Sequence, residues 1–103
     1  MRITVTLFMA AGMLAAGQTA FVGVITDTMC GADHKQMGIS PEDRCVRECV
    51  KHGASYALYD GKQLYRLSDQ QTPEKFAARK VRVTGVLYEK TKIIKVQKIE
   101  PAQ

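Results

Sequence analysis

The sequence lacks the short motifs that assign a chain to the common enzyme classes. It has no Cys-x-x-Cys pair and no Cys-x-x-Cys-His site for haem attachment. It also has no His-Glu-x-x-His zinc motif, no Gly-x-Ser-x-Gly elbow, no phosphate-binding loop and no dinucleotide fingerprint. Because these absences exclude the readily recognised hydrolases, nucleotide-binding enzymes and dithiol oxidoreductases, we expect a protein that is not an enzyme.

Long hydrophobic runs are also scarce, and the one near the start is short for a membrane span. A short positive segment, Met1–Arg2, precedes an uncharged apolar run, Ile3–Ala16, of about 14 residues, whereas a spanning helix needs roughly 20. Small residues follow, where a signal peptidase would cut. The pattern predicts a secretory signal peptide at 1–17, with cleavage after Ala20 as the alternative. We therefore expect a periplasmic or secreted protein with no transmembrane anchor after processing.

The remaining residues, 18–103, suffice for one small domain and are too few for two. The whole chain carries a formal charge of +5. Its basic residues concentrate toward the C-terminal end: Lys75, Arg79, Lys80, Arg82, Lys90, Lys92, Lys95 and Lys98. Such a surface either attracts an anionic envelope ligand or is simply a solvated strand face. Nucleic acid is not an expected partner outside the cell.

Strand-like and helix-like segments alternate along this domain. Residues 21–28 are apolar and β-branched with Gly23 among them, which predicts a first strand bent at the glycine. A helix is expected to begin at Ser40 and Pro41, which suit the N-cap and first-turn positions, and to stop at Gly53.

The second half of the domain is predicted to be mostly strand. Residues 56–67 form a hairpin around Asp60–Gly61, which accepts a two-residue type I′ turn. Thr72–Pro73–Glu74 begins a second, shorter helix through about Arg79. Two further strands follow at 81–88 and 92–99, the first with alternating buried and solvated positions.

This order predicts a mainly β fold with two short helices: an OB-like, five-stranded Greek-key barrel with a helix inserted between strands 1 and 2. The segments YALYDGKQLYRLSD, EKFAARKVRVTGVL and IIKVQKIE resemble those of small secreted bacterial OB-fold proteins. The segments GVITDTMCGADH and CVRECVKHGASYAL are similar to secreted bacterial domains of uncharacterised function. The resemblance implies an OB fold and export, and it implies no particular activity.

All cysteines and histidines of the chain fall within one short stretch: Cys30, His34, Cys45, Cys49 and His52. On a helix, Cys45, Cys49 and His52 share one side, because 3.6 residues per turn brings i, i+4 and i+7 together. Thiolate and imidazole donors suit Zn²⁺ or Cu⁺. We therefore predict a soft-metal site from these five residues, with His34 preferred to His52 and with Asp27 and Asp33 as partners that orient a histidine ring.

A disulfide is the competing interpretation, because nearby cysteines of an exported protein usually pair. Three pairings of Cys30, Cys45 and Cys49 are possible, and each leaves one thiol. A bond from Cys30 to either helical cysteine would pin the loop to the helix and stabilise the fold by about 2–4 kcal/mol. Thiol redox chemistry is the third possibility.

A ligand-binding sheet face is a further candidate site. Tyr56 and Tyr65 would offer stacking surfaces, with Arg66, Arg82 and Lys95 as cations for an anionic ligand. Taken together, the sequence predicts a secreted binding domain with a Cys/His cluster that holds either a metal ion or a disulfide.

Overall fold

The computed structural model describes residues 17–29, 31 and 42–102. The predicted signal peptide lies outside these residues, apart from Gly17. No helix in the described ranges is long and apolar enough to cross a membrane.

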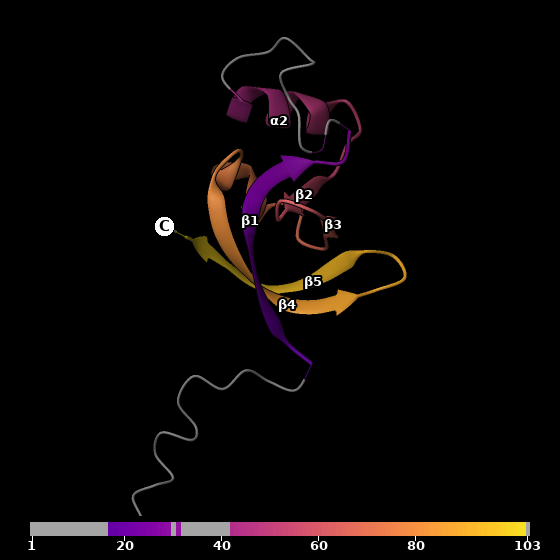
Figure 1. Ribbon diagram of the computed structural model, residues 1–103. Helices are drawn as coiled ribbons and strands as arrows, with labels where there is room; N and C mark the ends of the chain where they lie inside the picture. Colours follow the sequence, from indigo (N-terminus) through magenta and orange to yellow (C-terminus); the bar gives the residue numbers. More distant parts are fainter. Residues whose placement is uncertain (1–16, 30, 32–41, 103) are drawn as a thin grey trace, which may run out of the picture.

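Five strands form a sheet that closes on itself in the order β1-β2-β3-β5-β4 (Figure 1). Their bounds are Thr19–Asp27 for β1, Tyr56–Tyr59 for β2, Leu64–Leu67 for β3, Lys80–Tyr88 for β4 and Ile93–Pro101 for β5. Neighbouring strands are antiparallel except β3 and β5, which pair in parallel through Arg66↔Ile93 and Leu67↔Ile94. The predicted mainly β, five-stranded fold is confirmed.

β1 closes the ring of strands because it pairs with both β4 and β2. Its first part, Thr19–Val24, pairs with β4, and its last part, Val24–Asp27, pairs with β2. Gly23 lies where the partner changes, and a Cβ there would stand 2.4 Å from the carbonyl oxygen of Tyr59. Only glycine allows the two backbones to come this close, which explains the glycine in an otherwise β-branched strand.

A second close approach occurs where β4 and β5 change register. The shift lies between Thr84 and Gly85, and a Cβ on Gly85 would meet the Lys95 carbonyl oxygen. Bulges of this kind increase the local twist that a closed sheet requires. The two glycines thus set the curvature of the ring.

The interior is filled by alternate residues of the strands and by one side of the helix. Along β4, Val81 and Val83 are fully buried while Arg82 is exposed, as the alternating pattern predicted. The core cluster contains Ile25, Val46, Tyr56, Leu58, Tyr65, Leu67, Phe76, Ala77, Val81, Val83 and Ile94.

The helix α2 (Glu42–Lys51) connects β1 to β2 and lies across one end of the sheet (Figure 1). Its predicted starting residues Ser40 and Pro41 lie outside the described ranges. Its end agrees with the prediction: Gly53 has φ +108°, and the Ala54 amide donates to the Cys49 carbonyl at 3.0 Å. A left-handed glycine just past the last turn is a common helix terminator.

The predicted second helix is shorter than expected. A 3-10 turn, η2, spans Thr72–Phe76, and the amides of Thr72 and of Gln71 just before it donate to the carboxylate of Asp69. The prediction through Arg79 was wrong because residues 77–79 pair with β1 instead. The Ala78 amide donates to the Ile25 carbonyl at 2.9 Å, and the Ile25 amide donates to the Arg79 carbonyl at 3.0 Å.

The hairpin of β2 and β3 is confirmed, but its turn is wider than predicted. Tyr59 pairs with Leu64, so the loop is the four residues 60–63 rather than the two residues Asp60–Gly61. The Asp60 carboxylate accepts the amides of Lys62 and Gln63, each at 2.8 Å. These bonds satisfy the loop backbone locally and favour the longer turn.

Candidate functional site

Two cysteines lie on the buried side of α2. Cys45 is 0 % exposed and Cys49 is 2 % exposed, and Val46 between them is also fully buried. The two sulfur-bearing side chains are one helical turn apart and belong to the side of α2 that packs toward β1. No disulfide joins two of the described residues, so Cys45 and Cys49 are not bonded to each other.

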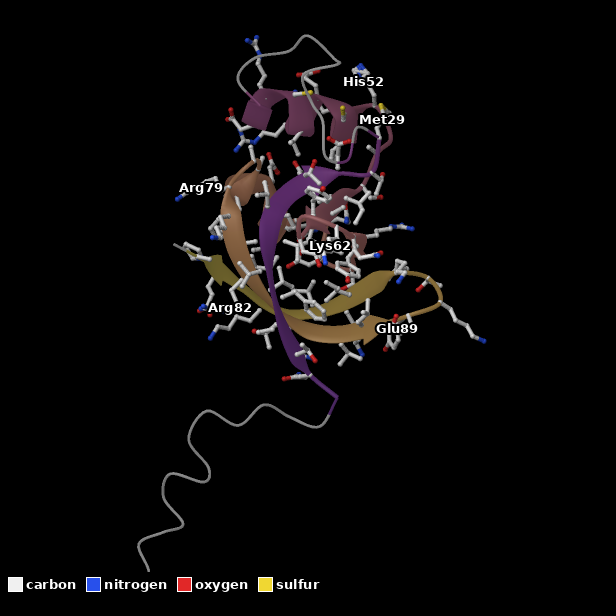
Figure 2. The ribbon with its side chains drawn as sticks, viewed as in Figure 1. Met29, His52, Lys62, Arg79, Arg82 and Glu89 are labelled. Carbon is white, nitrogen blue, oxygen red and sulfur yellow. The ribbon has the colours of Figure 1, made fainter. Side chains whose placement is uncertain are left out.

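His52 does not lie on the same buried side. It follows the last helical residue, Lys51, and its ring is exposed, with Nδ1 3.2 Å from the carbonyl oxygen of Glu48. Figure 2 shows it at the outer surface near the end of α2. Within residues 17–29, 31 and 42–102, no three side chains of Cys, His, Asp or Glu are grouped to hold a metal ion.

The other three predicted residues, Cys30, His34 and Asp33, lie outside the described ranges. The residues that flank Cys30 are described, and hydrogen bonds hold this part of the chain at the end of β1 and beside Ser55, which follows α2. The Thr28 amide donates to the Ser55 carbonyl at 2.9 Å, and the Ser55 amide donates to Thr28 Oγ1 at 3.0 Å. The Gly31 amide donates to the Asp27 carbonyl at 3.1 Å. The chain before position 30 therefore lies beside Ser55, which follows α2, and Gly31 after it is bonded back to the end of β1.

Asp27, predicted to orient a histidine, closes the turn after β1. Its side chain is fully buried, and its Oδ1 accepts the Met29 amide at 2.8 Å. This bond fixes the direction in which the chain leaves the sheet toward residue 30.

The five residues of the predicted ligand face are divided between the two sides of the sheet. Tyr56 and Tyr65 are buried at 4 % and 8 % exposure, and the Tyr65 ring packs on Phe21 with centroids 5.7 Å apart. The cations Arg66, Arg82 and Lys95 are exposed. Tyr65 and Arg66 are consecutive residues of β3, so their side chains point to opposite faces. This separation could have been predicted from the sequence, because side chains alternate between the two faces along a strand.

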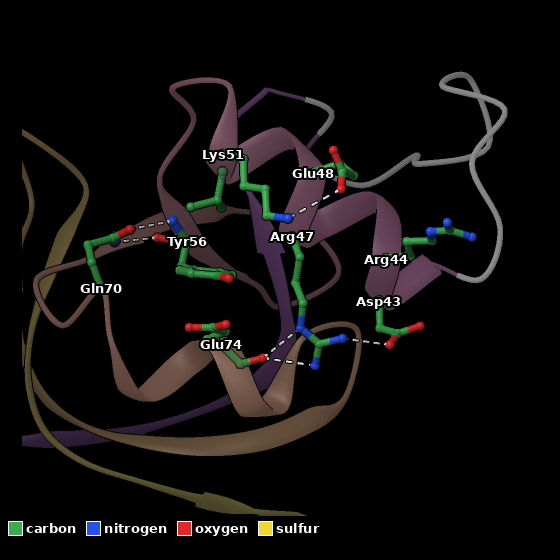
Figure 3. Close-up of a pocket in the computed structure, with 9 residues that line it drawn as sticks. Asp43, Arg44, Arg47, Glu48, Lys51, Tyr56, Gln70 and Glu74 are labelled. Atoms are coloured by element: carbon green, nitrogen blue, oxygen red, sulfur yellow. Dashed lines mark hydrogen bonds and ion pairs between the residues drawn. The ribbon is translucent and has the colours of Figure 1, made fainter.

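The groove between α2 and η2 was missed by sequence reasoning. It has a volume of about 580 Å³ and lies beside the first residue of β2 (Figure 3). Its lining residues are Asp43, Arg44, Arg47, Glu48, Val50, Lys51, Tyr56, Gln70 and Glu74. Three acidic and three basic side chains are among them, so the groove has no net formal charge.

Arg47 holds the two walls of this groove together. Its Nε and Nη2 donate to the Glu74 carbonyl oxygen at 3.1 and 3.0 Å, and its Nη1 donates to Asp43 Oδ2 at 2.8 Å. The Asp43–Arg47 spacing of i, i+4 is visible in the sequence and indicates a polar helix side. The partner carbonyl is 27 residues away in the chain, and no local pattern predicts it.

Gln70 and Tyr56 form the inner end of the groove. The Gln70 side chain accepts the Tyr56 amide at 2.7 Å and donates to the Tyr56 carbonyl at 3.0 Å. Burial raises the pKa of the Tyr56 hydroxyl above its ordinary value of 10.0; the Glu74 carboxylate raises it further and Arg47 opposes both. The hydroxyl therefore keeps its proton at neutral pH.

Comparison with known proteins gives one match. A family model described as "Protein of unknown function (DUF5818)" matches residues 51–102, just over half of the chain. The chain belongs to the DUF5818 family. The DUF5818 description agrees with the predicted likeness to domains of uncharacterised function. No curated protein and no solved structure matches the chain.

The DUF5818 match divides the candidate residues into two groups. Tyr56, Gln70 and Glu74 lie within the matched stretch, whereas Cys45 and Cys49 precede it. β1 and nearly all of α2 also precede the match. The inner end of the groove is thus part of the DUF5818 segment, and the cysteine-bearing helix is joined to it.

Proposed function

We propose that the chain matures into an exported, non-enzymatic binding domain of OB-like architecture, in which a disulfide from Cys30 to Cys45 or Cys49 fixes α2 to the sheet. The observation that carries this proposal is the burial of both helical cysteines on the sheet side of α2, with Thr28, two residues before Cys30, bonded to Ser55 just beyond that helix. A disulfide closing a loop of this length stabilises the folded state by about 3 kcal/mol.

The OB-like part of the proposal is supported by the strand connections. Five strands close into a ring in which β5 inserts between β3 and β4, so that β3 pairs with a strand that is not its neighbour in sequence. An OB fold is a small five-stranded Greek-key barrel, which this arrangement resembles.

Export is supported by the signal-peptide pattern of residues 1–17 and by the start of β1. Cleavage after Gly17 leaves the whole of β1, which begins at Thr19. Cleavage after Ala20 would remove Thr19 and Ala20, which pair with Gly85 and Thr84 of β4. We therefore propose Gly17 as the last residue of the leader and 18–103 as the domain.

The disulfide is preferred to a metal site because His52, the one described histidine, stands at the surface away from the buried cysteines. A Zn²⁺ or Cu⁺ site remains the second candidate. It is favoured by two buried cysteines spaced one turn apart, an arrangement that suits thiolate ligation.

Intact mass and alkylation of protein purified from the periplasm under non-reducing conditions test the proposal. We expect a mass lower by two hydrogens than the reduced chain, with one alkylatable thiol, and a mature N-terminus at Gln18. Peptide mapping identifies the partner of Cys30, and Cys30→Ser should abolish the bond and lower stability by about 3 kcal/mol. Three alkylatable thiols that appear only after chelation would contradict the disulfide and assign a metal. Three thiols without any bound metal would reject both.

A further inference from the structure

The groove between α2 and η2 has the features of a small-ligand site, independent of the sulfur chemistry proposed above. The groove lies on the polar side of α2, whereas Cys45 and Cys49 lie on the buried side and do not line it. Its volume of about 580 Å³ accommodates a small organic molecule. Figure 3 shows the Tyr56 ring between the two walls, with its hydroxyl directed into the space between Lys51 and Glu74.

The Tyr56 side chain is largely buried, and its hydroxyl opens into the groove. The residue is 4 % exposed, and its backbone amide and carbonyl bond to Gln70, but its hydroxyl makes no hydrogen bond within the described residues. A hydroxyl that opens into a groove can donate a hydrogen bond to a molecule bound there. A ligand atom that accepts this hydrogen bond would be held in a defined position, so the hydroxyl marks the place where a bound molecule is recognised.

The two walls offer opposite charges. Glu74 of η2 uses its backbone carbonyl to bind Arg47, and its carboxylate has no ion pair in the part of the chain that the structure describes. On the α2 wall, Lys51 Nζ lies 3.7 Å from Glu48 with a side chain that is 71 % exposed, and Arg44 is also exposed. An unpaired carboxylate therefore faces a loosely held ammonium group across the Tyr56 hydroxyl (Figure 3).

The opposite charges of Glu74 and Lys51 determine which kind of charged ligand the groove can bind. An anion attracted by Lys51 is repelled by Glu74, and a cation attracted by Glu74 is repelled by Lys51. A sugar would find no stacking surface, because the Tyr56 ring is buried. A zwitterion satisfies both walls at once.

We propose that the α2–η2 groove binds a small zwitterion, an α-amino acid or a short peptide. The ammonium group of the ligand binds the Glu74 carboxylate, and the carboxylate of the ligand lies against Lys51 and accepts a hydrogen bond from the Tyr56 hydroxyl. Arg47 positions Glu74 through the backbone and leaves the acidic side chain available to the ligand.

Titration of the ¹⁵N-labelled full chain by NMR tests this proposal, with L-alanine, L-glutamine and L-alanyl-L-alanine as probes. We expect saturable shifts confined to α2, the start of β2 and residues 70–76 with at least one probe. N-acetylation or methyl esterification of that probe removes one charge and should weaken binding at least about 10-fold, since a charge-assisted hydrogen bond is lost. Absence of saturable shifts with all three probes would overturn the proposal.

Two variants and two matched controls assign the site. Glu74→Gln and Tyr56→Phe should each weaken binding by about 10-fold. Glu89→Gln and Tyr88→Phe change the same residue types at exposed positions of the β4–β5 hairpin and should leave binding unchanged. If Tyr56→Phe fails to fold, as shown by circular dichroism, Glu74→Gln alone decides. Equal binding by Glu74→Gln and the wild type, or equal binding of sucrose, would refute the zwitterion site.

The proposed disulfide and the proposed zwitterion site can be rejected independently of each other. The titration is carried out on the oxidised and on the reduced chain. A negative result in both forms rejects the groove and leaves the mass and alkylation result unaffected.

Discussion

The body of the sheet and the α2–η2 end are held together by different means. In the sheet, β1 and β4 approach neighbouring backbones so closely at Gly23 and Gly85 that no Cβ fits, and the core cluster is apolar. At the α2–η2 end, a few polar side chains make the connections, chiefly Arg47 and Gln70. The sheet therefore depends on shape at a few positions, whereas the α2–η2 end depends on individual hydrogen bonds that can be removed one at a time.

The largest expected effect comes from filling a close approach in the sheet. Gly85→Ala places a Cβ 2.1 Å from the Lys95 carbonyl oxygen, and we expect a loss of at least about 3 kcal/mol of unfolding free energy or failure to fold. Gly61→Ala is the control, because nothing lies within 4 Å of its Cβ and only its φ of +105° opposes a side chain. It should cost about 1 kcal/mol. Equal losses in urea denaturation would mean that backbone contact does not close the ring.

A smaller and more local effect is expected at α2. Arg47→Ala removes three hydrogen bonds that are partly exposed to water, and it should lower stability by about 1–2 kcal/mol. Hydrogen exchange should become faster in α2 and η2 and stay unchanged in β4. Arg44→Ala, an exposed neighbour on the same helix, should change stability by less than about 0.5 kcal/mol. Faster exchange in β4 would show that the two regions are not separable.

The smallest effect is a pH-dependent one at the start of η2. Burial acts to raise the pKa of Asp69, but hydrogen bonds from Thr72 and Gln71 outweigh it and the pKa lies below the ordinary 3.8. Because the folded pKa is depressed, Asp69 stabilises the fold above pH 3.8, and this contribution is lost as the pH falls through the folded pKa. Asp69→Ala should cost about 1 kcal/mol at pH 7, like loss of a helix cap, and less at pH 2. A cost that is the same at both pH values would contradict the assignment.

The regular elements could be predicted from the sequence because their determinants are local. Alternation at Val81 and Val83 identified β4, and Gly53 identified the end of α2. The pairing of residues 77–79 with Ile25 could not be predicted, because its determinant is a β1 strand more than fifty residues earlier. The local sequence of residues 77–79 favoured a helix, but their hydrogen bonds to Ile25 of β1 determine the observed structure.

The candidate sites show the same limit. The Cys45–Cys49 spacing indicated that the two cysteines share one side of the helix, because helix periodicity alone determines that. The groove was not predictable, since Arg47, Tyr56 and Glu74 come from three separate elements. The separation of Tyr65 from Arg66, in contrast, was predictable from the sequence. Consecutive residues of a strand point to opposite faces, so the ring and the cation cannot share one ligand-binding face.

The double pairing of β1 also has a kinetic consequence. Thr19 pairs with Gly85 and Gly23 with Val81, contacts that span roughly 60 residues and that form only after a large loop has closed. A chain of this topology folds slowly for its size, and its last strands must be available before its first strand finds both partners. A domain delivered N-terminus first would therefore stay open, with unpaired strand edges, until almost all of it had arrived.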